Sequence, residues 1–287
     1  MAKKKKKKSA LKRILLLVVV CYGGYFGIST YLLSENTNTN PIQEETVSTI
    51  HEEVFPQTGD PLIDNLYPLS LEDERILTII ENKEEYPDIL LEMLGRNIDM
   101  IDYMLGYPEK KGNVYTTELE DIKKGTYPLL LQYDTRWGYA SYGNSVIAIN
   151  GCGPTAISII VAGLTGRSDV TPSKVASLAE EKGYYVEGIG TSWSLMTEGV
   201  NEYGITGKQI TLSRSNMTKE LKQNHPIIAS MKPGDFTTTG HFISIVGIKD
   251  GKFVIRDSNS KERSNKLWSY DTLAPQIKNL WTFKLQD

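Results

Sequence analysis

The sequence predicts an α+β fold, in which a run of helices precedes an antiparallel sheet. Two observations support this prediction. Between residues 71 and 205, several segments have apolar residues at helical spacing, and they begin at a capping residue or end at a glycine. From residue 207 on, short segments rich in β-branched residues alternate with Gly, Pro and Asn, as successive strands do: "GKQITL", "PIIASMKP", "HFISIVGIKD", "GKFVIRDSN" and "LWTFKL".

The first 33 residues are typical of a membrane anchor. Eight basic residues and no acidic residue occupy positions 1–13, and the 20 residues at 14–33 carry no charge. An uncharged segment of this length spans a bilayer as a helix, and the basic flank keeps the N-terminus in the cytoplasm. A cleaved signal peptide is the alternative, but no clean small-x-small cleavage site follows. We therefore expect a single-pass signal-anchor in a cell membrane, with an extracellular domain.

The composition of the remaining chain argues against several classes of function. After residue 13, 24 basic residues face 35 acidic ones, whereas a nucleic-acid-binding protein needs a basic surface. Three His and two Cys are too few for a His or Cys metal cluster. The chain also lacks a P-loop, a GxGxxG motif after a strand and a GxSxG motif. We therefore expect no metal, cofactor or nucleic-acid partner.

The anchored part divides into three regions. Residues 34–63 are rich in Asn, Thr and Glu without a sustained apolar period, which predicts a polar stalk. Residues 64–126 predict two or three short helices. Residues 127–287 form the predicted main domain, where "YPLLLQYDTRWGY" predicts a strand and an aromatic turn. Three helices are then expected, in "CGPTAISIIVAGLTG", "TPSKVASLAEEKGYY" and "TSWSLMTEGVNEYGI".

Cys152 is the candidate nucleophile. Cys21 lies in the predicted membrane segment, so Cys152 is the one cysteine of the exported part and has no disulfide partner there. In "GCGP", Gly151 and Gly153 remove bulk around the sulfur, and a proline fits the first turn of a helix. A helix N-terminus lowers a thiol pKa from about 8.5, and it offers free N–H groups to an oxyanion. The alternative is a small buried residue that only fills the core.

Two further side chains fit a site around this cysteine. His241 starts the strand "HFISIVGI", and it is the histidine best placed to act as a base, although a structural histidine is the alternative. Gln132 ends "LLLQ", and its amide is suited to bind an oxyanion, although most such residues lie on the surface.

The segments "LLLQYDTRWGY", "GCGPTA", "GHFISIVG" and "VIRDSN", in this order, resemble the C39-like branch of the papain-type cysteine peptidases. The resemblance covers roughly residues 127–284 and implies a papain-like α+β fold in a bacterial, membrane-anchored peptidase. It implies Cys152 as nucleophile, His241 as base, Asp257 as the residue that orients the imidazole and Gln132 as an oxyanion donor. Relatives often have Asp-Pro where this chain has Asp257-Ser258.

We thus expect a thiol hydrolase that cleaves a peptide or protein substrate. Its expected binding residues are Trp137, Tyr139, Gly151 and Gly153. For the aromatic residues around Trp137, core packing is the alternative to a substrate groove. Other functions stay open: a cell-wall peptide or amide hydrolase, an acyl transferase, or a catalytically silent module that binds a peptide or glycan.

Strand pairing tests the role of Asp257. If the hairpin turn across "KDG" has two residues, Asp257 lies opposite Ser244 and on the wrong face for His241, unless a bulge intervenes. A three-residue loop, Lys249–Gly251, instead pairs Ile248 with Lys252 and brings Asp257 diagonally next to His241. The three-residue loop also places Asn259 directly opposite His241, as a competitor. The loop length stays open, and we expect Asp257 to have the role because a carboxylate stabilises the imidazolium better than a neutral amide does.

Overall fold

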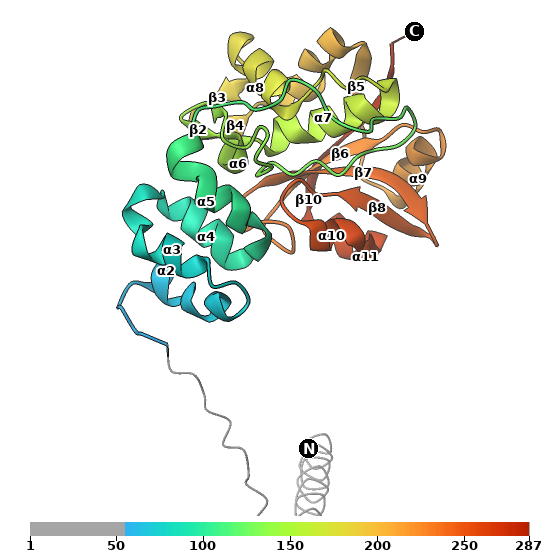
Figure 1. Cartoon of the computed structure of the whole chain (residues 1–287). Coiled ribbons are helices and arrows are strands. Elements are labelled where there is room, and N and C mark those ends of the chain that lie inside the picture. Colours follow the sequence, from blue (N-terminus) through green and yellow to red (C-terminus); the bar gives the residue numbers. More distant parts are fainter. Residues whose placement is uncertain (1–54, 287) are drawn as a thin grey trace, which may run out of the picture. The chain divides into compact units, whose positions relative to one another are not determined.

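The computed structural model describes residues 55–286, whose arrangement is drawn in Figure 1. The predicted cytoplasmic tail (1–13), the predicted membrane segment (14–33) and residues 34–54 of the predicted stalk lie outside the described residues. Among the helices of residues 55–286, none combines the length and the apolar character that a membrane crossing requires.

A helical region with its own apolar core opens the described chain. Its α-helices are α2 (Pro61–Asp64), α3 (Ile76–Glu81), α4 (Asp88–Arg96) and α5 (Ile101–Lys110), with the 3-10 helices η1 (Tyr67–Leu71), η2 (Lys83–Glu85) and η3 (Ile98–Met100) between them. These helices bury Leu90, Leu94, Met100 and Met104 in one cluster. Because α2 begins at Pro61, residues 61–63 belong to this folded region and not to the stalk.

The segment between this region and the main domain differs from the prediction. Residues 111–140 contain no strand, so the strand predicted in "YPLLLQYDTRWGY" is wrong. Past Leu131, the backbone N–H groups of Asp134, Trp137 and Gly138 bond to carbonyls three or four residues back. These bonds form successive turns, so the backbone is not extended there and cannot pair with a neighbouring strand.

The predicted helix at Cys152 is present. After the short strands β1 (Ser141–Tyr142) and β2 (Ser145–Val146) and the short helix α6 (Ile147–Asn150), helix α7 covers Cys152–Thr165. It ends at Gly166, whose φ of 79° is the left-handed conformation that a terminating glycine adopts without steric cost. Cys152 is therefore the first residue of a long, almost fully buried helix.

Two further predicted helices have different outcomes. Helix α8 (Pro172–Glu181) forms as expected, and the hydroxyl of Thr171 caps it by accepting the N–H of Lys174 at 3.2 Å. The short strands β3 (Tyr185–Val186) and β4 (Gly190–Thr191) follow. The segment predicted as one helix after Thr191 instead forms two 3-10 helices, η4 (Trp193–Met196) and η5 (Gly199–Tyr203), with N–H groups bonded three residues back.

The main sheet has six antiparallel strands in the order β5-β10-β6-β7-β8-β9. All five strand segments predicted after residue 206 contribute to it, and the α+β fold is confirmed. The strands are β5 (Ile205–Gln209), β6 (Ile227–Met231), β7 (His241–Lys249), β8 (Lys252–Arg256), β9 (Leu267–Trp268) and β10 (Ile277–Leu285). The short helices around them are α9 (Arg214–Lys222), α10 (Lys261–Asn265), α11 (Tyr270–Leu273) and η6 (Ala274–Gln276).

Each face of the sheet has its own apolar cluster. On one face, Ile228, Phe242 and Trp281 pack with the apolar residues of α7. On the other face, alternate residues of the same strands pack with Met217 of α9 and Leu273 of α11. Figure 1 shows α7 and α8 on one side of the sheet and α10 and α11 on the other. Helix α7 packs against β7 in this arrangement of a sheet between helices, so Cys152 and His241 belong to adjacent layers.

The β7–β8 hairpin brings Asp257 to the face of His241 by means of a bulge. Lys249 pairs with Lys252, so the turn has two residues, which is the shorter of the two loops considered. Asp250 and Gly251 have φ values of 52° and 72°, as a two-residue Asp-Gly turn requires. The ladder then shifts between Ile245 and Gly247, which marks a bulge.

This bulge corrects the register at the end of the hairpin that approaches α7. Beyond the bulge, Ile245 pairs with Ile255 and Ser244 with Arg256. Asp257, the next residue, therefore follows opposite Ile243 and one diagonal step from His241. The two-residue turn alone would have sent its side chain to the other face.

Candidate active site

Cys152 lies at the meeting point of α7 and β7. It is half-buried, and His241 and the backbone N–H groups of Phe242 and Gly153 lie close enough to its sulfur to stabilise a thiolate. As the first residue of α7, Cys152 has an N–H group without a partner inside the helix. The positive end of the helix dipole therefore faces the thiol and the space in front of it.

His241 connects this sulfur to a buried carboxylate. Its Nε2 lies 2.7 Å from Oδ1 of Asp257, so Nδ1 is the ring nitrogen available to Cys152. His241 is 7% exposed, and Asp257 is fully buried. A proton on Nε2 is thus held by the carboxylate, while Nδ1 is left for the sulfur.

Four polar groups fix Asp257. Its Oδ1 accepts the N–H of Asn259 at 2.8 Å in addition to His241, and its Oδ2 accepts Nε–H of Arg263 at 2.6 Å. Its own backbone N–H donates to the hydroxyl of Ser264 at 2.9 Å. The carboxylate is therefore held on both oxygens, and its charge is shared between a histidine and an arginine.

Asn259, the competitor for the role of Asp257, has a different position. Its backbone N–H bonds to Asp257, and its carbonyl accepts Nδ2–H of Asn97 at 3.0 Å. Its Oδ1 is buried and has no hydrogen-bond partner within the described residues. The histidine contact thus goes to Asp257, and Asn259 supports that carboxylate through its backbone.

Gln132 is buried beside the cysteine, and its amide orientation is fixed. Its Nε2 donates to the carbonyl of Ala148 at 2.6 Å, and its Oε1 accepts the hydroxyl of Ser258 at 3.1 Å. A carbonyl only accepts, so the amide nitrogen must be the atom that faces Ala148. Its backbone N–H also donates to the carbonyl of Ser258 at 2.8 Å. One of the two amide hydrogens stays available for another acceptor.

The contacts shift the pKa of Cys152 downward. Burial alone raises the pKa of this thiol, but the hydrogen bond and the charge of His241 outweigh burial, and the two backbone N–H groups add to their effect. The thiolate therefore forms at lower pH than for an ordinary cysteine.

The pKa values of His241 and Asp257 move in opposite directions. Burial lowers the pKa of His241, but the negative charge of Asp257 and the hydrogen bond to it prevail and raise the value to about 10. Burial raises the pKa of Asp257, whereas His241 and then Arg263 bring it below the usual range. Together these shifts favour a thiolate, an imidazolium and a carboxylate at neutral pH.

A cleft of about 910 Å³ opens in front of Cys152 and His241. Gln132 and Asn259 also line it, as do residues of α4, of the β3–β4 hairpin and of the loop between β6 and β7. This volume lies in the range typical of small-molecule and peptide sites. The thiol is therefore open to a ligand even though its partners are buried.

The predicted binding residues are not in this cleft. Trp137 and Tyr139 have no exposed surface and pack in the core, which corrects the prediction that they line a substrate groove. Gly151 and Gly153 are buried too. A Cβ on Gly153 would lie 2.7 Å from Oγ1 of Thr191, and one on Gly151 would lie 2.5 Å from the carbonyl oxygen of Ile147. These glycines permit close packing around the cysteine and do not face the cleft.

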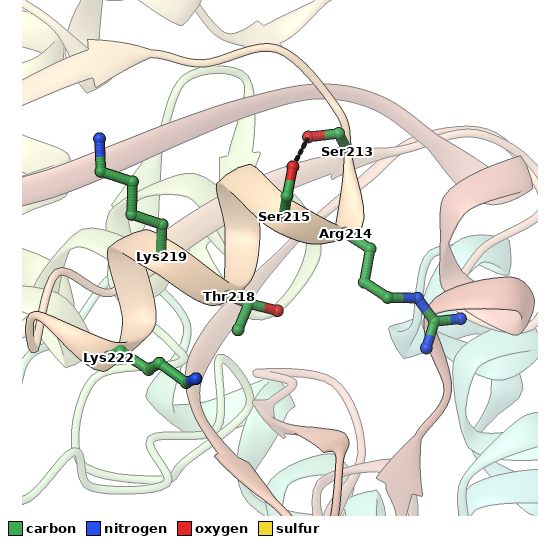
Figure 2. Close-up of a pocket in the computed structure, with 6 residues that line it drawn as sticks. All are labelled: Ser213, Arg214, Ser215, Thr218, Lys219 and Lys222. Carbon is green, nitrogen blue, oxygen red and sulfur yellow. Dashed lines mark hydrogen bonds between the residues drawn. The ribbon is translucent and has the colours of Figure 1, made fainter.

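A second hollow, shown in Figure 2, lies along α9. Its lining includes Arg214, Lys219 and Lys222, and the hydroxyls of Ser213 and Ser215 hydrogen-bond to each other there at 3.2 Å. It is shallow and contains no residue of the cysteine site. Among the described residues, no group of His, Cys, Asp or Glu is arranged to hold a metal ion.

Sequence reasoning missed three residues that support the site. Arg263 bonds to Asp257, and Ser258 bonds to Gln132. Asn97 joins the helical region to Asn259, in the loop that also contains Asp257 and Ser258. No local pattern marks Arg263 or Asn97. For Ser258, the departure from the Asp-Pro of relatives was the one available signal.

Comparisons with known proteins identify the family of the chain. Residues 125–283, more than half of the chain, match the model of the Peptidase_C39 like family. The peptidase domain of Streptococcus ComA, a bifunctional ABC transporter involved in quorum sensing, has 16% identity and a TM-score of 0.37, over 56% of this chain and 100% of that one. A C39-like peptidase from Bacillus anthracis, described as putative in its own report, has 13% identity and a TM-score of 0.38, over 60% of this chain and 98% of that one. No curated protein matches. On the evidence of the family model, the chain belongs to the Peptidase_C39 like family.

Proposed function

We propose that this protein is a cysteine peptidase that hydrolyses a peptide bond with Cys152 as nucleophile. One observation carries the proposal: a continuous series of contacts runs from the half-buried sulfur through His241 to the buried carboxylate of Asp257, at the edge of a cleft. A nucleophile, a base and a group that orients the base are the elements of covalent acyl transfer.

In the first step, the thiolate attacks the carbonyl carbon of the scissile bond. The C–O π electrons move to the oxygen, which becomes negatively charged. Its charge is stabilised by the N–H of Cys152 and by the amide hydrogen of Gln132 that Ala148 does not use. Because Ser258 and Ala148 fix this amide beforehand, the donor needs no reorganisation during the reaction.

In the second step, the tetrahedral intermediate expels the amine. His241 gives its Nδ1 proton to the leaving nitrogen, and the acyl group stays on Cys152 as a thioester. Water then attacks the thioester while His241 takes up a proton from that water. The carboxylic acid leaves and Cys152 is again a thiolate. Asp257 keeps the imidazole ring in one orientation throughout.

Thiol reactivity gives the direct test. Iodoacetamide should alkylate Cys152 rapidly well below pH 8 and much more slowly in His241→Ala, because the imidazole lowers the thiol pKa. Purified protein and Cys152→Ala should then be incubated with a proteome-derived peptide mixture and with purified cell wall, and new termini located by mass spectrometry. Cleavage of the cell wall without cleavage of the peptides would identify the cell-wall polymer as the substrate. Slow alkylation without any cleavage would favour a silent binding module.

Gln132→Ala separates oxyanion stabilisation from thiol activation. Loss of one such donor lowers the rate by about 100- to 1,000-fold. Alkylation of Cys152 should be almost unchanged, since the amide does not touch the imidazole in our scheme. An equal loss of both activities would indicate a folding defect, which a thermal melt would reveal.

We further propose that residues 14–33 tether the domain to the outer face of a bacterial cell membrane. The lysine-rich flank and the uncharged stretch of 20 residues support this topology. Protease added to intact cells should release a soluble fragment by cutting within residues 34–60. A mature N-terminus near residue 30 in untreated cells would instead indicate cleavage of a signal peptide.

A further inference from the structure

Helix α4 contributes to the cleft although it precedes the part of the chain that matches the family model. It covers Asp88–Arg96, whereas the match begins at residue 125. Ile89, Met93 and Arg96 nevertheless line the same cleft as Cys152 and His241. One wall of the candidate active site thus belongs to the helical region that precedes the matched residues.

The two faces of α4 have different neighbours. Leu90, Leu91 and Leu94 point into the core of the helical region and are buried. The residues at the alternate helical spacing line the cleft: Ile89, Glu92, Met93 and Arg96. Ile89 is 42% exposed there, which leaves an apolar surface without a partner beside the thiol.

The cleft face of α4 offers apolar contact and no net charge. Oε2 of Glu92 and an Nη of Arg96 lie 2.6 Å apart, so the two charges of this face satisfy each other. Ile89 and Met93 line the cleft on the same helix. A ligand that contacts this wall therefore meets two apolar side chains beside an ion pair whose charges neutralise each other.

The wall is fastened to the loop that carries the buried carboxylate. Just after α4, Asn97 donates from Nδ2 to the carbonyl of Asn259 at 3.0 Å and to the hydroxyl of Tyr133 at 3.2 Å. Nearby, Nζ of Lys261 and Oδ2 of Asp99 lie 3.6 Å apart. These contacts keep α4 at a fixed place relative to Asp257.

A second apolar patch enters the cleft from the β3–β4 side. Ile189 is 80% exposed at the tip of this hairpin, and Trp193 is 42% exposed at the start of η4. The ring of Trp193 is supported edge to face by Trp281, at a centroid distance of 5.3 Å. In the view of Figure 1, α4 lies below α6 and the β3–β4 hairpin above it. The two patches therefore approach the start of α7 from different sides.

Exposed apolar residues gather at this cleft. Of nine large hydrophobic side chains that are exposed among the described residues, Ile89, Ile189 and Trp193 all line it. Single exposed apolar residues are ordinary, but a group around one concave site marks a binding surface.

We propose that α4 and the β3–β4 hairpin select a peptide substrate by binding bulky apolar side chains near the scissile bond. This inference rests on the proposed function, because the occupant is the substrate of Cys152. The cleft is continuous from Cys152 to both patches, so a chain with its carbonyl at the thiol extends along them. Ile89, Met93, Ile189 and Trp193 are specificity residues in this assignment, and through α4 the helical region before residue 125 becomes part of the substrate site.

The test compares matched peptides on the full-length protein. A peptide found to be cleaved in the mixture is resynthesised with each Leu, Ile or Phe near the cleaved bond replaced in turn by Ser. The variants are Ile89→Ser and Ile189→Ser, with Leu77→Ser as control. Leu77 on α3 is 40% exposed, similar to Ile89, and does not line the cleft. All three substitutions replace exposed side chains, so stability should change little.

We expect the wild-type protein to prefer one apolar peptide over its Ser counterpart by about tenfold in kcat/KM. Ile89→Ser should remove most of that preference at one peptide position and Ile189→Ser at another, mainly through KM. Leu77→Ser should keep it, and iodoacetamide should label Cys152 equally in all four proteins. Should Ile89→Ser and Ile189→Ser retain the full preference while peptides are cleaved, this inference is overturned and the proposed function stands. Absence of peptide cleavage together with slow alkylation would overturn both.

Discussion

The two sides of the cleft hold their functional groups by different means. Cys152 starts a helix that is buried on almost every side, and close packing at Gly153 brings that helix against Thr191. His241 and Asp257 depend instead on a polar network. The position of the Cys152 sulfur is thus set by close packing, and that of the His241 imidazole by hydrogen bonds and charge. Substitutions on the first side should change stability, and those on the second should change the rate and its pH dependence.

The largest effect is expected at Asp257, the centre of the polar side. Asp257→Ala should lower turnover by about 1,000- to 10,000-fold, as loss of the orienting acid does in related mechanisms. Its removal leaves Arg263 and His241 without their shared counter-charge, so a thermal melt should also show destabilisation. Asn259→Ala should cost only a few-fold, because its side chain has no contact with His241. The reverse ranking would transfer the role to Asn259.

On the packing side, Gly153→Ala should reduce stability. The new Cβ would lie 2.7–2.8 Å from the side chain of Thr191, which is closer than packed atoms tolerate. We expect a loss of about 1–3 kcal/mol in the free energy of unfolding. Gly95→Ala in α4 is the matched control: its Cβ would meet Leu66 at 3.8 Å, so it should stabilise the helix by roughly 0.5–1 kcal/mol. Equal melting temperatures for the two variants would contradict the comparison.

Arg263 should influence the pH profile through Asp257. Activity requires a thiolate and an imidazolium, so it rises as pH passes the lowered pKa of Cys152 and falls as pH passes the raised pKa of His241. Arg263→Gln removes a cation that competes for Asp257, so the pKa of His241 should rise further. The alkaline limb should then move to higher pH while the maximal rate falls, because a less acidic imidazolium protonates the leaving amine more slowly.

Arg263→Lys tests whether the positive charge alone sets the alkaline limb of the pH–activity profile. Lysine keeps the positive charge but loses the Nε–H that meets Asp257 at 2.6 Å. The alkaline limb should stay near the wild-type position even where the rate is reduced. Identical pH profiles for all three proteins would leave Arg263 with a purely structural role.

A smaller effect than at Asp257 is expected at Ser258. Ser258→Ala removes the hydroxyl that holds Oε1 of Gln132 at 3.1 Å, while the bond from Nε2 to Ala148 persists. The rate should fall about tenfold or less, in line with the ~1 kcal/mol of one neutral hydrogen bond. Alkylation of Cys152 should be unchanged, and Ser258→Thr should recover part of the rate. A loss as large as that of Gln132→Ala would mean that the serine alone orients the amide.

The sequence was sufficient where the signal was local. The glycine-framed cysteine at a helix start and the strand that begins at His241 each lie within a few residues, and the structure contains both. It brings Gln132 into the same cleft as well. Their catalytic roles stay predictions.

Other features depend on contacts between distant segments. Asn97 meets Asn259 across 162 residues, and no local pattern predicts such a pair. The aromatic residues Trp137 and Tyr139 suit a groove or a core equally by composition, and only tertiary burial decides between them. The strand expected near Gln132 failed for a related reason, since apolar residues in a short run do not reveal whether a neighbouring strand is available.

The bulge in β7 also has a consequence for how the hairpin tolerates changes in length. Ile245 pairs with Ile255 beyond the bulge, and a three-residue loop without a bulge would produce that same pairing. A two-residue turn with the bulge and a three-residue turn without it therefore give the same pairing next to His241. One residue added to the Asp250–Gly251 turn, with Val246 deleted, should leave His241 and Asp257 in register, and so should a longer insertion that keeps Lys249 paired with Lys252. The tip of this hairpin is accordingly a place where a probe or an affinity tag can be inserted at a distance from the thiol.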